Sequence, residues 1–252
     1  MTVEIVTVPC LSDNYAYLVK AGDAVAVVDP SEPGPVTAAL GTRGWRLSHI
    51  LNTHHHLDHT GGNLALKQAT GARVVGPAKD AARIPGIDVG VEEASGWEFG
   101  GLSVQVLEVP AHTRGAISFV IGGNAFTGDT LFAMGCGRLF EGDPAMMWNS
   151  LSKLMRLPDA TRVWCGHEYT ENNGRFALTL EPGNQALQAR MVDVRMARAE
   201  GGKITMPSDM GLEKATNPFL RVASPEIRKS LGMEKAGDVA VFGEIRRRKD
   251  SF

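Results

Sequence analysis

The sequence lacks the features that mark membrane-spanning, secreted and nucleic-acid-binding proteins. Its three cysteines, Cys10, Cys136 and Cys165, are widely spaced and odd in number, which argues against a disulfide framework and favours a reducing compartment. No apolar run approaches the roughly 20 residues of a membrane helix, and the N-terminal residues do not show the pattern of a secretory signal. The formal net charge of −2 gives no general reason to bind nucleic acid or a membrane. We therefore expect a cytoplasmic monomer that binds neither.

The composition that is present is that of a globular protein, with 43% hydrophobic and 21% charged residues in a chain of 252. Up to about residue 168, β-branched and alternating runs are interspersed with helical runs, and residues 84–95 are expected to form a loop. The expected strands are 3–8, 15–19, 24–28, 47–51, 72–75, 98–99, 102–109, 117–121, 125–127 and 161–165. The expected helices are 33–40, 61–69, 145–155, 172–179, 184–200, 225–230 and 238–248. This order predicts an α/β sandwich over residues 1–168 and a smaller helical domain over residues 169–252.

One stretch, THHHLDHTGGN at residues 53–63, concentrates four histidines and one aspartate directly after the buried strand at 47–51. His54 and His56 are two residues apart, so on an extended segment both rings point to the same side, and His55 points to the other. Asp58 and His59 follow where the chain turns. Imidazole and carboxylate are ligands of zinc, iron and similar ions, and such crowding without a metal would be unfavourable. The stretch therefore predicts a metal site, with two ions close together.

Three further candidate ligands, His112, Asp129 and His167, each follow an expected strand. A single histidine in such a position is more often structural, but several strands that end at one sheet edge can bring distant ligands together. We assign one ion to His54, His56 and His112, and the other to Asp58, His59 and His167. Asp129 is assigned to both ions, because the two oxygens of a carboxylate can bridge two cations. Two ions about 3.5–4 Å apart, as is usual in two-metal sites, lower the pKa of a bound water and stabilise negative charge on a carbonyl oxygen.

The histidine stretch resembles the signature of the metallo-β-lactamase-fold hydrolases. The chain is more narrowly similar to glyoxalase II, the hydroxyacylglutathione hydrolase family. The narrower similarity rests on PCLSDNYAYL (9–18), GCGRLFEG (135–142), CGHEYT (165–170), NPFLR (217–221) and RRRKD (246–250). The similarity covers nearly the whole chain. It implies a four-layered αβ/βα sandwich followed by a helical substrate domain, and it supports the seven-ligand assignment.

The same resemblance implies a two-metal thioesterase, with zinc as the first choice of metal and iron or manganese as other choices. Its substrate would be S-(2-hydroxyacyl)glutathione, typically S-D-lactoylglutathione, in the second step of methylglyoxal detoxification. Asp58 is also a candidate for orienting the hydroxide that the ions generate, and Asp29 resembles the aspartate that supports the ligand loop. A turn or helix cap before Pro30 is the other interpretation of Asp29. The implied substrate residues are Arg138, Phe140, Tyr169, Arg246 and Lys249.

Two of these positions depart from the family pattern, which often has Lys in place of Arg138 and Tyr in place of Phe140. Arg138 keeps the charge and Phe140 keeps the ring, so substrate preference would change more than hydrolysis. Arg246 and Lys249 share a helix face, but a solvated basic helix end would show the same pattern. The alternatives are a persulfide dioxygenase with one iron, which lacks the helical domain, another hydrolase of this fold such as a β-lactamase, and a metal-stabilised binding module.

Overall fold

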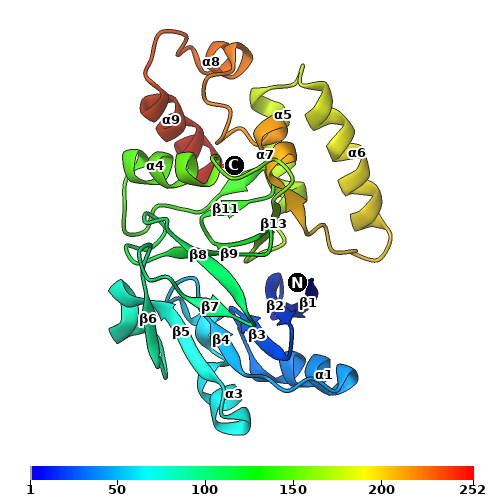
Figure 1. Cartoon of the computed structure of the whole chain (residues 1–252). Coiled ribbons are helices and arrows are strands. Elements are labelled where there is room, and N and C mark those ends of the chain that lie inside the picture. The colour runs from blue at the N-terminus through cyan, green and yellow to red at the C-terminus, as the bar shows by residue number, and fades with distance from the viewer. Residues whose placement is uncertain (1) are drawn as a thin grey trace.

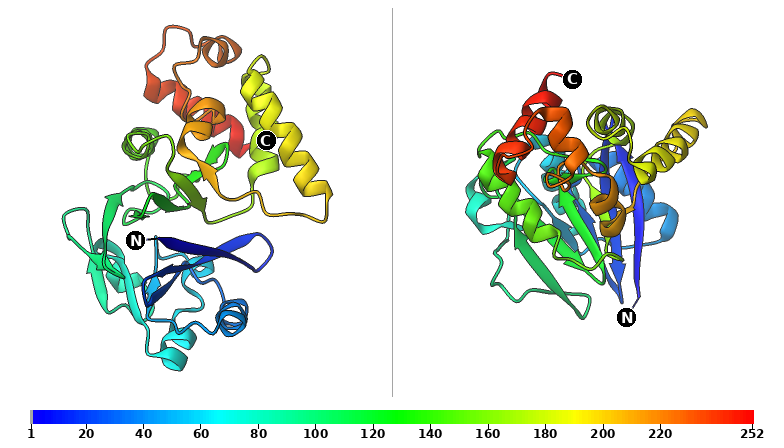
Figure 2. Two further views of the ribbon diagram at one scale, coloured as in Figure 1. Left: turned by 45° about the vertical axis from the view of Figure 1, so that its right-hand side comes forward. Right: turned by 90° about the horizontal axis from the view of Figure 1, so that it is seen from above.

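In the computed structural model, which describes residues 2–252, two six-stranded sheets lie face to face (Figures 1 and 2). Buried side chains from both sheets fill the space between them, including Tyr17, Val28, Phe119 and Phe126. Helices cover the outer face of each sheet, which gives the predicted αβ/βα layers. The fold class predicted from the sequence is therefore confirmed.

The first sheet has the order β1-β2-β3-β4-β5-β6. Its strands are β1 (Val3–Cys10), β2 (Asn14–Ala21), β3 (Ala24–Val28), β4 (His49–Leu51), β5 (Arg73–Pro77) and β6 (Val89–Val91). The first three strands are antiparallel, and β3 to β6 are parallel. The prediction of a loop over residues 84–95 is wrong, because β6 lies within it. This strand is only three residues long, so no alternation of polar and apolar residues is visible in it. Its central residue is Gly90, where a Cβ would lie only 3.0 Å from the Ala78 backbone, so a side chain would crowd this position.

The second sheet has the order β14-β13-β10-β9-β8-β7. Its strands are β7 (Glu98–Phe99), β8 (Leu102–Glu108), β9 (Ile117–Ile121), β10 (Asn124–Gly128), β13 (Arg162–Cys165) and β14 (Ser208–Asp209), and a separate two-stranded sheet holds β11 (Leu131–Phe132) and β12 (Gly135–Cys136). The two-residue strand β14, which the sequence did not predict, brings the C-terminal region to the edge of this sheet.

The outer face of the first sheet is covered by α1 (Pro33–Arg43) and α3 (Asn63–Thr70), while α4 (Pro144–Leu154) covers the second sheet. Between β4 and β6 lie the short helix α2 (Leu57–Thr60) and the 3-10 helix η1 (Ala78–Arg83). Helix α1 begins with a proline in its first turn and ends at Gly44, whose φ of 64° suits glycine. Helix α4 begins at Asp143, whose side chain accepts a hydrogen bond from the Met146 N–H.

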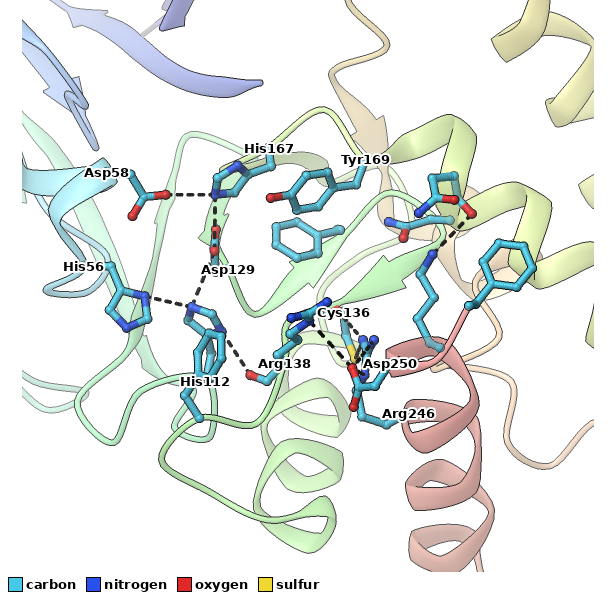
Figure 3. Close-up of a pocket in the computed structure, with 16 residues that line it drawn as sticks. His56, Asp58, His112, Asp129, Cys136, Arg138, His167, Tyr169, Arg246 and Asp250 are labelled. Atoms are coloured by element: carbon cyan, nitrogen blue, oxygen red, sulfur yellow. Dashed lines mark hydrogen bonds and ion pairs between the residues drawn. The ribbon is translucent and has the colours of Figure 1, made fainter. Parts of the chain in front are cut away.

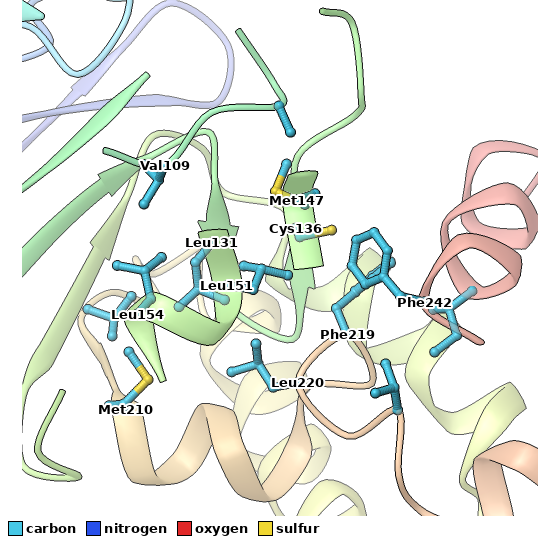
Figure 4. Close-up of a cluster of buried hydrophobic side chains, with 14 of the residues drawn as sticks. Val109, Leu131, Cys136, Met147, Leu151, Leu154, Met210, Phe219, Leu220 and Phe242 are labelled. Carbon is cyan, nitrogen blue, oxygen red and sulfur yellow. The ribbon is translucent and has the colours of Figure 1, made fainter. Parts of the chain in front are cut away.

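The C-terminal region is helical, as predicted. It contains α5 (Thr170–Leu180), α6 (Gln185–Ala199), α7 (Met210–Thr216), α8 (Pro225–Leu231) and α9 (Asp238–Asp250). Helix α7 was not predicted, because it is seven residues long and contains Gly211. Phe219 and Phe242 pack into one cluster with Leu151 and Leu154 of α4 and Val109 (Figure 4). The two regions therefore share a core, and the domain boundary at residue 168 stays a prediction.

No helix in residues 2–252 is long and apolar enough to cross a membrane.

Candidate metal centre

The candidate ligands meet where strands of both sheets end. Strands β8, β10 and β13 run in the same direction, so His112, Asp129 and His167 follow them at one edge of the second sheet. The first sheet faces this edge with the parallel strands β3 and β4, which precede Asp29 and His54. The predicted meeting of strand ends is what brings together ligands that lie more than 100 residues apart in the sequence.

The candidate ligands form two groups of three, His54 with His56 and His112, and Asp58 with His59 and His167, and a third group of donor atoms joins Asp29 with His54 and His59. Within each group the donor atoms lie within 4.8 Å of one another. The Asp129 carboxylate lies between the groups. Its Oδ2 is 3.4 Å from His112 Nε2 and 3.3 Å from His167 Nε2 (Figure 3). Its Oδ1 is 3.3 Å from His59 Nε2. The geometry thus has the grouping that the sequence predicted, and the ligand role of each residue stays a prediction.

Four of the five histidines in these groups have one ring nitrogen held by an outer partner, which leaves Nε2 to face the centre. These contacts are His54 Nδ1 to Thr53 Oγ1 at 3.0 Å, His59 Nδ1 to Asp29 Oδ2 at 3.2 Å, His112 Nδ1 to the Arg138 carbonyl at 3.0 Å, and His167 Nδ1 to Asp13 Oδ1 at 2.8 Å. Such partners fix ring orientation in metal sites. His55 instead turns away and lies 3.0 Å from Asp80 Oδ2, as expected for a structural residue.

Asp29 is the partner with the most contacts. Its carboxylate accepts hydrogen bonds from the Thr53 N–H at 2.8 Å and the Thr53 hydroxyl at 2.6 Å, and it also contacts His59. Its backbone has a φ of +48°, a left-handed conformation that Asp and Asn tolerate better than most residues. These contacts join the carboxylate to the ligand loop. Among the described side-chain contacts, no N–H of the turn or helix that follows Pro30 donates to it.

The centre has strongly altered proton affinities. Burial, with a smaller contribution from His59, holds the pKa of His54 well below its usual value. Burial disfavours charge on His59 and His167 as well, but the neighbouring carboxylates outweigh it and raise the pKa of His167 to about 10 and that of His59 well above its usual value. Burial would raise the pKa of Asp129, yet His59 and His167 hold it well below the usual range. Protons on His59 and His167 thus neutralise the carboxylates, and cations that bind here would displace them.

Two buried atoms show that the donor set fits cations. His54 Nε2 has no hydrogen-bond partner among the described residues, and Asp129 Oδ1 has only its ion pair with His59. A buried polar atom without a partner costs about 1–3 kcal/mol. His54 belongs to one ligand group, and Asp129 contacts histidines of both groups. Imidazole and carboxylate in this arrangement suit two divalent ions.

A cavity of about 550 Å³ begins at this centre and ends at helix α9 (Figure 3). The five residues predicted to bind substrate all line it: Arg138, Phe140, Tyr169, Arg246 and Lys249. The Tyr169 ring stacks on His167 with centroids 4.8 Å apart, and Phe140, 61% exposed, has its ring edge-on or tilted against His56 and His112. The cavity therefore joins a metal-binding end, with the ligand groups, to a basic end on α9.

The two cations of α9 differ in their surroundings. Arg246 is only 6% exposed, so the interpretation of a solvated basic helix end does not describe it. Its guanidinium donates to the Cys136 carbonyl at 2.9 Å, pairs with Asp250 at 2.8 Å and lies over the Phe219 ring. Lys249 Nζ lies 3.3 Å from the Asn172 carbonyl and over the rings of Phe176 and Phe252. Burial, with nearby arginines, lowers the pKa of Lys249 to about 8.

Sequence reasoning missed three polar residues of this cavity region. No local pattern predicts a role for Asp13 or Asn14, yet Asp13 lies 2.8 Å from His167 Nδ1, and Asn14 donates to the Asp58 carboxylate at 3.1 Å. Their partners are 154 and 44 residues away in the sequence, so spacing could not identify them. Asp250 pairs with Arg246 and lies 3.8 Å from Arg138, and its spacing of four residues from Arg246 on one helix is a signal that could have indicated this pair. All three residues lie in stretches that resemble glyoxalase II.

Comparison with known proteins places both regions of the chain. The family model "Metallo-beta-lactamase superfamily" matches residues 11–167, and "Hydroxyacylglutathione hydrolase C-terminus" matches residues 168–252. A hydroxyacylglutathione hydrolase from Methylococcus capsulatus is 54% identical over 99% of this chain and 98% of its own length, and one from Cereibacter sphaeroides is 55% identical over 100% of both.

Solved structures agree on the fold. ETHE1 from Myxococcus xanthus has a TM-score of 0.67 with 25% identity, and the match covers 100% of this chain and 99% of that one. The BLEG-1 B3 metallo-beta-lactamase has a TM-score of 0.65 at 20% identity, over 87% of this chain and 99% of its own. The two family models and the full-length relatives show that the chain belongs to the hydroxyacylglutathione hydrolase family of the metallo-β-lactamase superfamily.

Proposed function

We propose that this protein is a thioester hydrolase that converts S-(2-hydroxyacyl)glutathione, typically S-D-lactoylglutathione, to glutathione and a 2-hydroxy acid. This is the second step of methylglyoxal detoxification. The observation that carries the proposal is the single cavity that joins the ligand groups to the cations of α9. The relatives of about 50% identity that bear the name hydroxyacylglutathione hydrolase support it.

The two ligand groups would hold two divalent cations, zinc by preference, with Asp129 shared between them. Bound there, such ions supply an activated water and stabilise charge that develops on the thioester oxygen. Asp58, whose side chain is 41% exposed at the cavity, would orient the attacking water. A thiolate leaves readily, so no residue is required to protonate the leaving group.

The basic end would recognise the peptide part of the substrate. Arg246 and Lys249 are assigned to the glycine carboxylate of glutathione, since both line the cavity and share one helix face. Arg138 would contact the peptide backbone. Phe140 and Tyr169 lie against the ligand histidines and would border the acyl group and the thioester.

The proposal is tested with purified protein and S-D-lactoylglutathione. We expect release of glutathione that stops with a chelator and returns when zinc is added. A thioester without carboxylates, S-lactoyl-N-acetylcysteamine, is the matched control and should require a far higher concentration for the same rate. Metal-loaded protein that leaves lactoylglutathione intact would disprove the proposal, and oxygen uptake with glutathione persulfide would support the dioxygenase alternative instead.

Three smaller proposals accompany it. Zinc as the bound metal is tested by metal analysis of protein purified without added metals. A monomer is tested by light scattering on protein eluting from a size-exclusion column, which should give the molar mass of one chain, 27.0 kDa. A cytoplasmic location agrees with three cysteines that are free and buried, and fractionation of cells tests it.

A further inference from the structure

The turn between β1 and β2 lies against the chain segment that carries His167. The Tyr15 N–H donates to the Gly166 carbonyl at 2.8 Å, and the Glu168 N–H donates to the Asp13 carbonyl at 2.8 Å. The Tyr15 hydroxyl donates to Glu168 Oε2 at 2.6 Å. Two of the stretches that resemble glyoxalase II, residues 9–18 and 165–170, are therefore one structural unit. The proposed chemistry uses His167 and Tyr169 of this unit but gives no role to Asp13 and Asn14.

The side chains of this turn reach ligands of one metal group only. Asp13 Oδ1 lies 2.8 Å from His167 Nδ1. The buried amide of Asn14 donates to the Asp58 carboxylate at 3.1 Å and to the Asp58 carbonyl at 3.2 Å. The other group is held differently, because Thr53 contacts His54 and the Arg138 carbonyl contacts His112.

Asp58 needs such support more than the other ligands do. It lies on α2, a helix of four residues, and its side chain is 41% exposed, whereas the ligand histidines His54, His59, His112 and His167 are buried. A partly exposed carboxylate on a short helix has several rotamers available, and fixing one of them before a cation binds raises affinity.

We propose that Asp13 and Asn14 are positioning residues for the second metal, the one assigned to Asp58, His59 and His167. Asn14 holds the Asp58 carboxylate, with its amide also 3.5 Å from His167 Nε2, and Asp13 holds the His167 ring, so the turn would control the affinity of this ion through its ligands. The other ion, assigned to His54, His56 and His112, does not depend on the turn. The inference rests on the two-metal assignment of the proposed function.

The experiment measures zinc bound per chain. Parent protein, Asn14→Ala and Asp13→Ala are loaded with zinc, desalted into metal-free buffer, analysed for metal and then titrated with zinc. We expect two equivalents in the parent and one in each variant, with the dissociation constant of the lost ion raised roughly 10- to 100-fold. Asn14→Leu keeps the side-chain volume without a donor and should lose the same ion, whereas Asp13→Asn keeps an acceptor for His167 and should retain both.

Tyr15→Phe is the matched control, because it alters the same turn by removing only the hydrogen bond to Glu168. It should keep two equivalents. Loss of one ion in this control, loss of both ions in Asn14→Ala, or two tightly bound ions in Asn14→Ala and Asn14→Leu would each overturn the proposal.

The stoichiometry also separates this inference from the proposed function. A parent protein with two ions that loses one in Asn14→Ala, but that leaves lactoylglutathione intact, would disprove the thioesterase and leave the role of the turn standing. Normal hydrolysis of lactoylglutathione by a parent protein that holds a single ion would support the thioesterase and disprove the role of the turn.

Discussion

The two ends of the cavity are built in different ways. At the metal-binding end, ligands from the ends of strands in two sheets are largely buried, and outer partners hold most of the histidine rings before any ligand arrives. At the basic end, α9 supplies Arg246, Lys249 and Asp250, and the charged groups contact one another. Arg138 and Asp250 have side chains that are 65% and 45% exposed.

This difference assigns different tasks to the two ends. A preorganised site acts on the transition state, so changes at the metal-binding end should lower metal content and kcat. A partly exposed site that only binds should affect KM and leave kcat unchanged. Four substitutions and the pH dependence of KM test this division of tasks.

The largest effect is expected from Asp129→Ala. This substitution removes the carboxylate between the two ligand groups and leaves His59 and His167 without their main counter-charge. We expect kcat to fall by at least roughly 100-fold, the scale of losing one electrostatic stabiliser, together with lower zinc content. Asp80→Asn is the control, because Asp80 is equally buried but contacts His55 and Arg83 rather than a ligand. An Asp129→Ala variant with normal kcat would contradict the assignment.

Asp29→Asn should have the next largest effect. Asn tolerates the positive φ at this position, so the backbone can persist, but the amide cannot accept from both Thr53 and His59 as the carboxylate does. We expect zinc affinity to fall roughly 10- to 100-fold with little change in KM. Zinc titration and steady-state kinetics with excess zinc measure the two quantities separately. An unchanged zinc affinity would indicate that Asp29 only caps the turn.

The two ends also differ in how much of them the sequence could predict. The spacing of His54, His56, Asp58 and His59 is local, so it is visible in the sequence. The strands that precede His112 and His167 are visible as β-branched runs, and the ends of such strands meet at one sheet edge. The metal-binding end could therefore be predicted from these two signals. The contacts of Asp13 and Asn14 depend on how the β1–β2 turn packs against distant segments, and no periodicity records them. The pair of Arg246 and Asp250 does have helical spacing, but its place in the cavity depends on how α9 packs. The same limit explains β6 and β14, whose pairing depends on neighbouring strands rather than on their own few residues.

At the basic end, Lys249→Met should raise KM for lactoylglutathione and leave kcat unchanged. Methionine keeps most of the stem that packs on Phe176 and Phe252 but removes the charge. A lost charge-assisted hydrogen bond at a half-buried position corresponds to about 1–2 kcal/mol, or roughly 5- to 30-fold in KM. Arg246 is less suitable for this test, because its contact with the Cys136 carbonyl also supports the fold. A fall in kcat instead would break the division between the two ends.

The pH dependence of KM gives a milder version of the same test. The pKa of Lys249 is lowered to about 8 by burial and by nearby arginines, so its charge is present below this pH and is lost above it. The charged fraction falls from roughly nine tenths at pH 7 to roughly one tenth at pH 9. We expect KM to rise over this range towards the value for Lys249→Met, and to stay flat in Lys249→Arg, because arginine remains charged. An equal rise in Lys249→Arg would assign the titration to another group.

The smallest effect is expected from Asp250→Asn, and its sign is informative. Asp250 places a negative charge where the substrate carboxylate is proposed to bind, 2.8 Å from Arg246 and 3.8 Å from Arg138. Arg246 is also held by the Cys136 carbonyl and by the Phe219 ring, so its position should survive the substitution. Removing the competing charge should therefore lower KM. The Asp250 side chain is 45% exposed, so water screens its charge even though Arg246 is buried. An ion pair screened in this way contributes about 0–1 kcal/mol, so the change in KM should be less than roughly 5-fold, and it should shrink at high salt. A higher KM would show that Asp250 orients Arg246 for the substrate, and the basic end would then be preorganised like the metal-binding end.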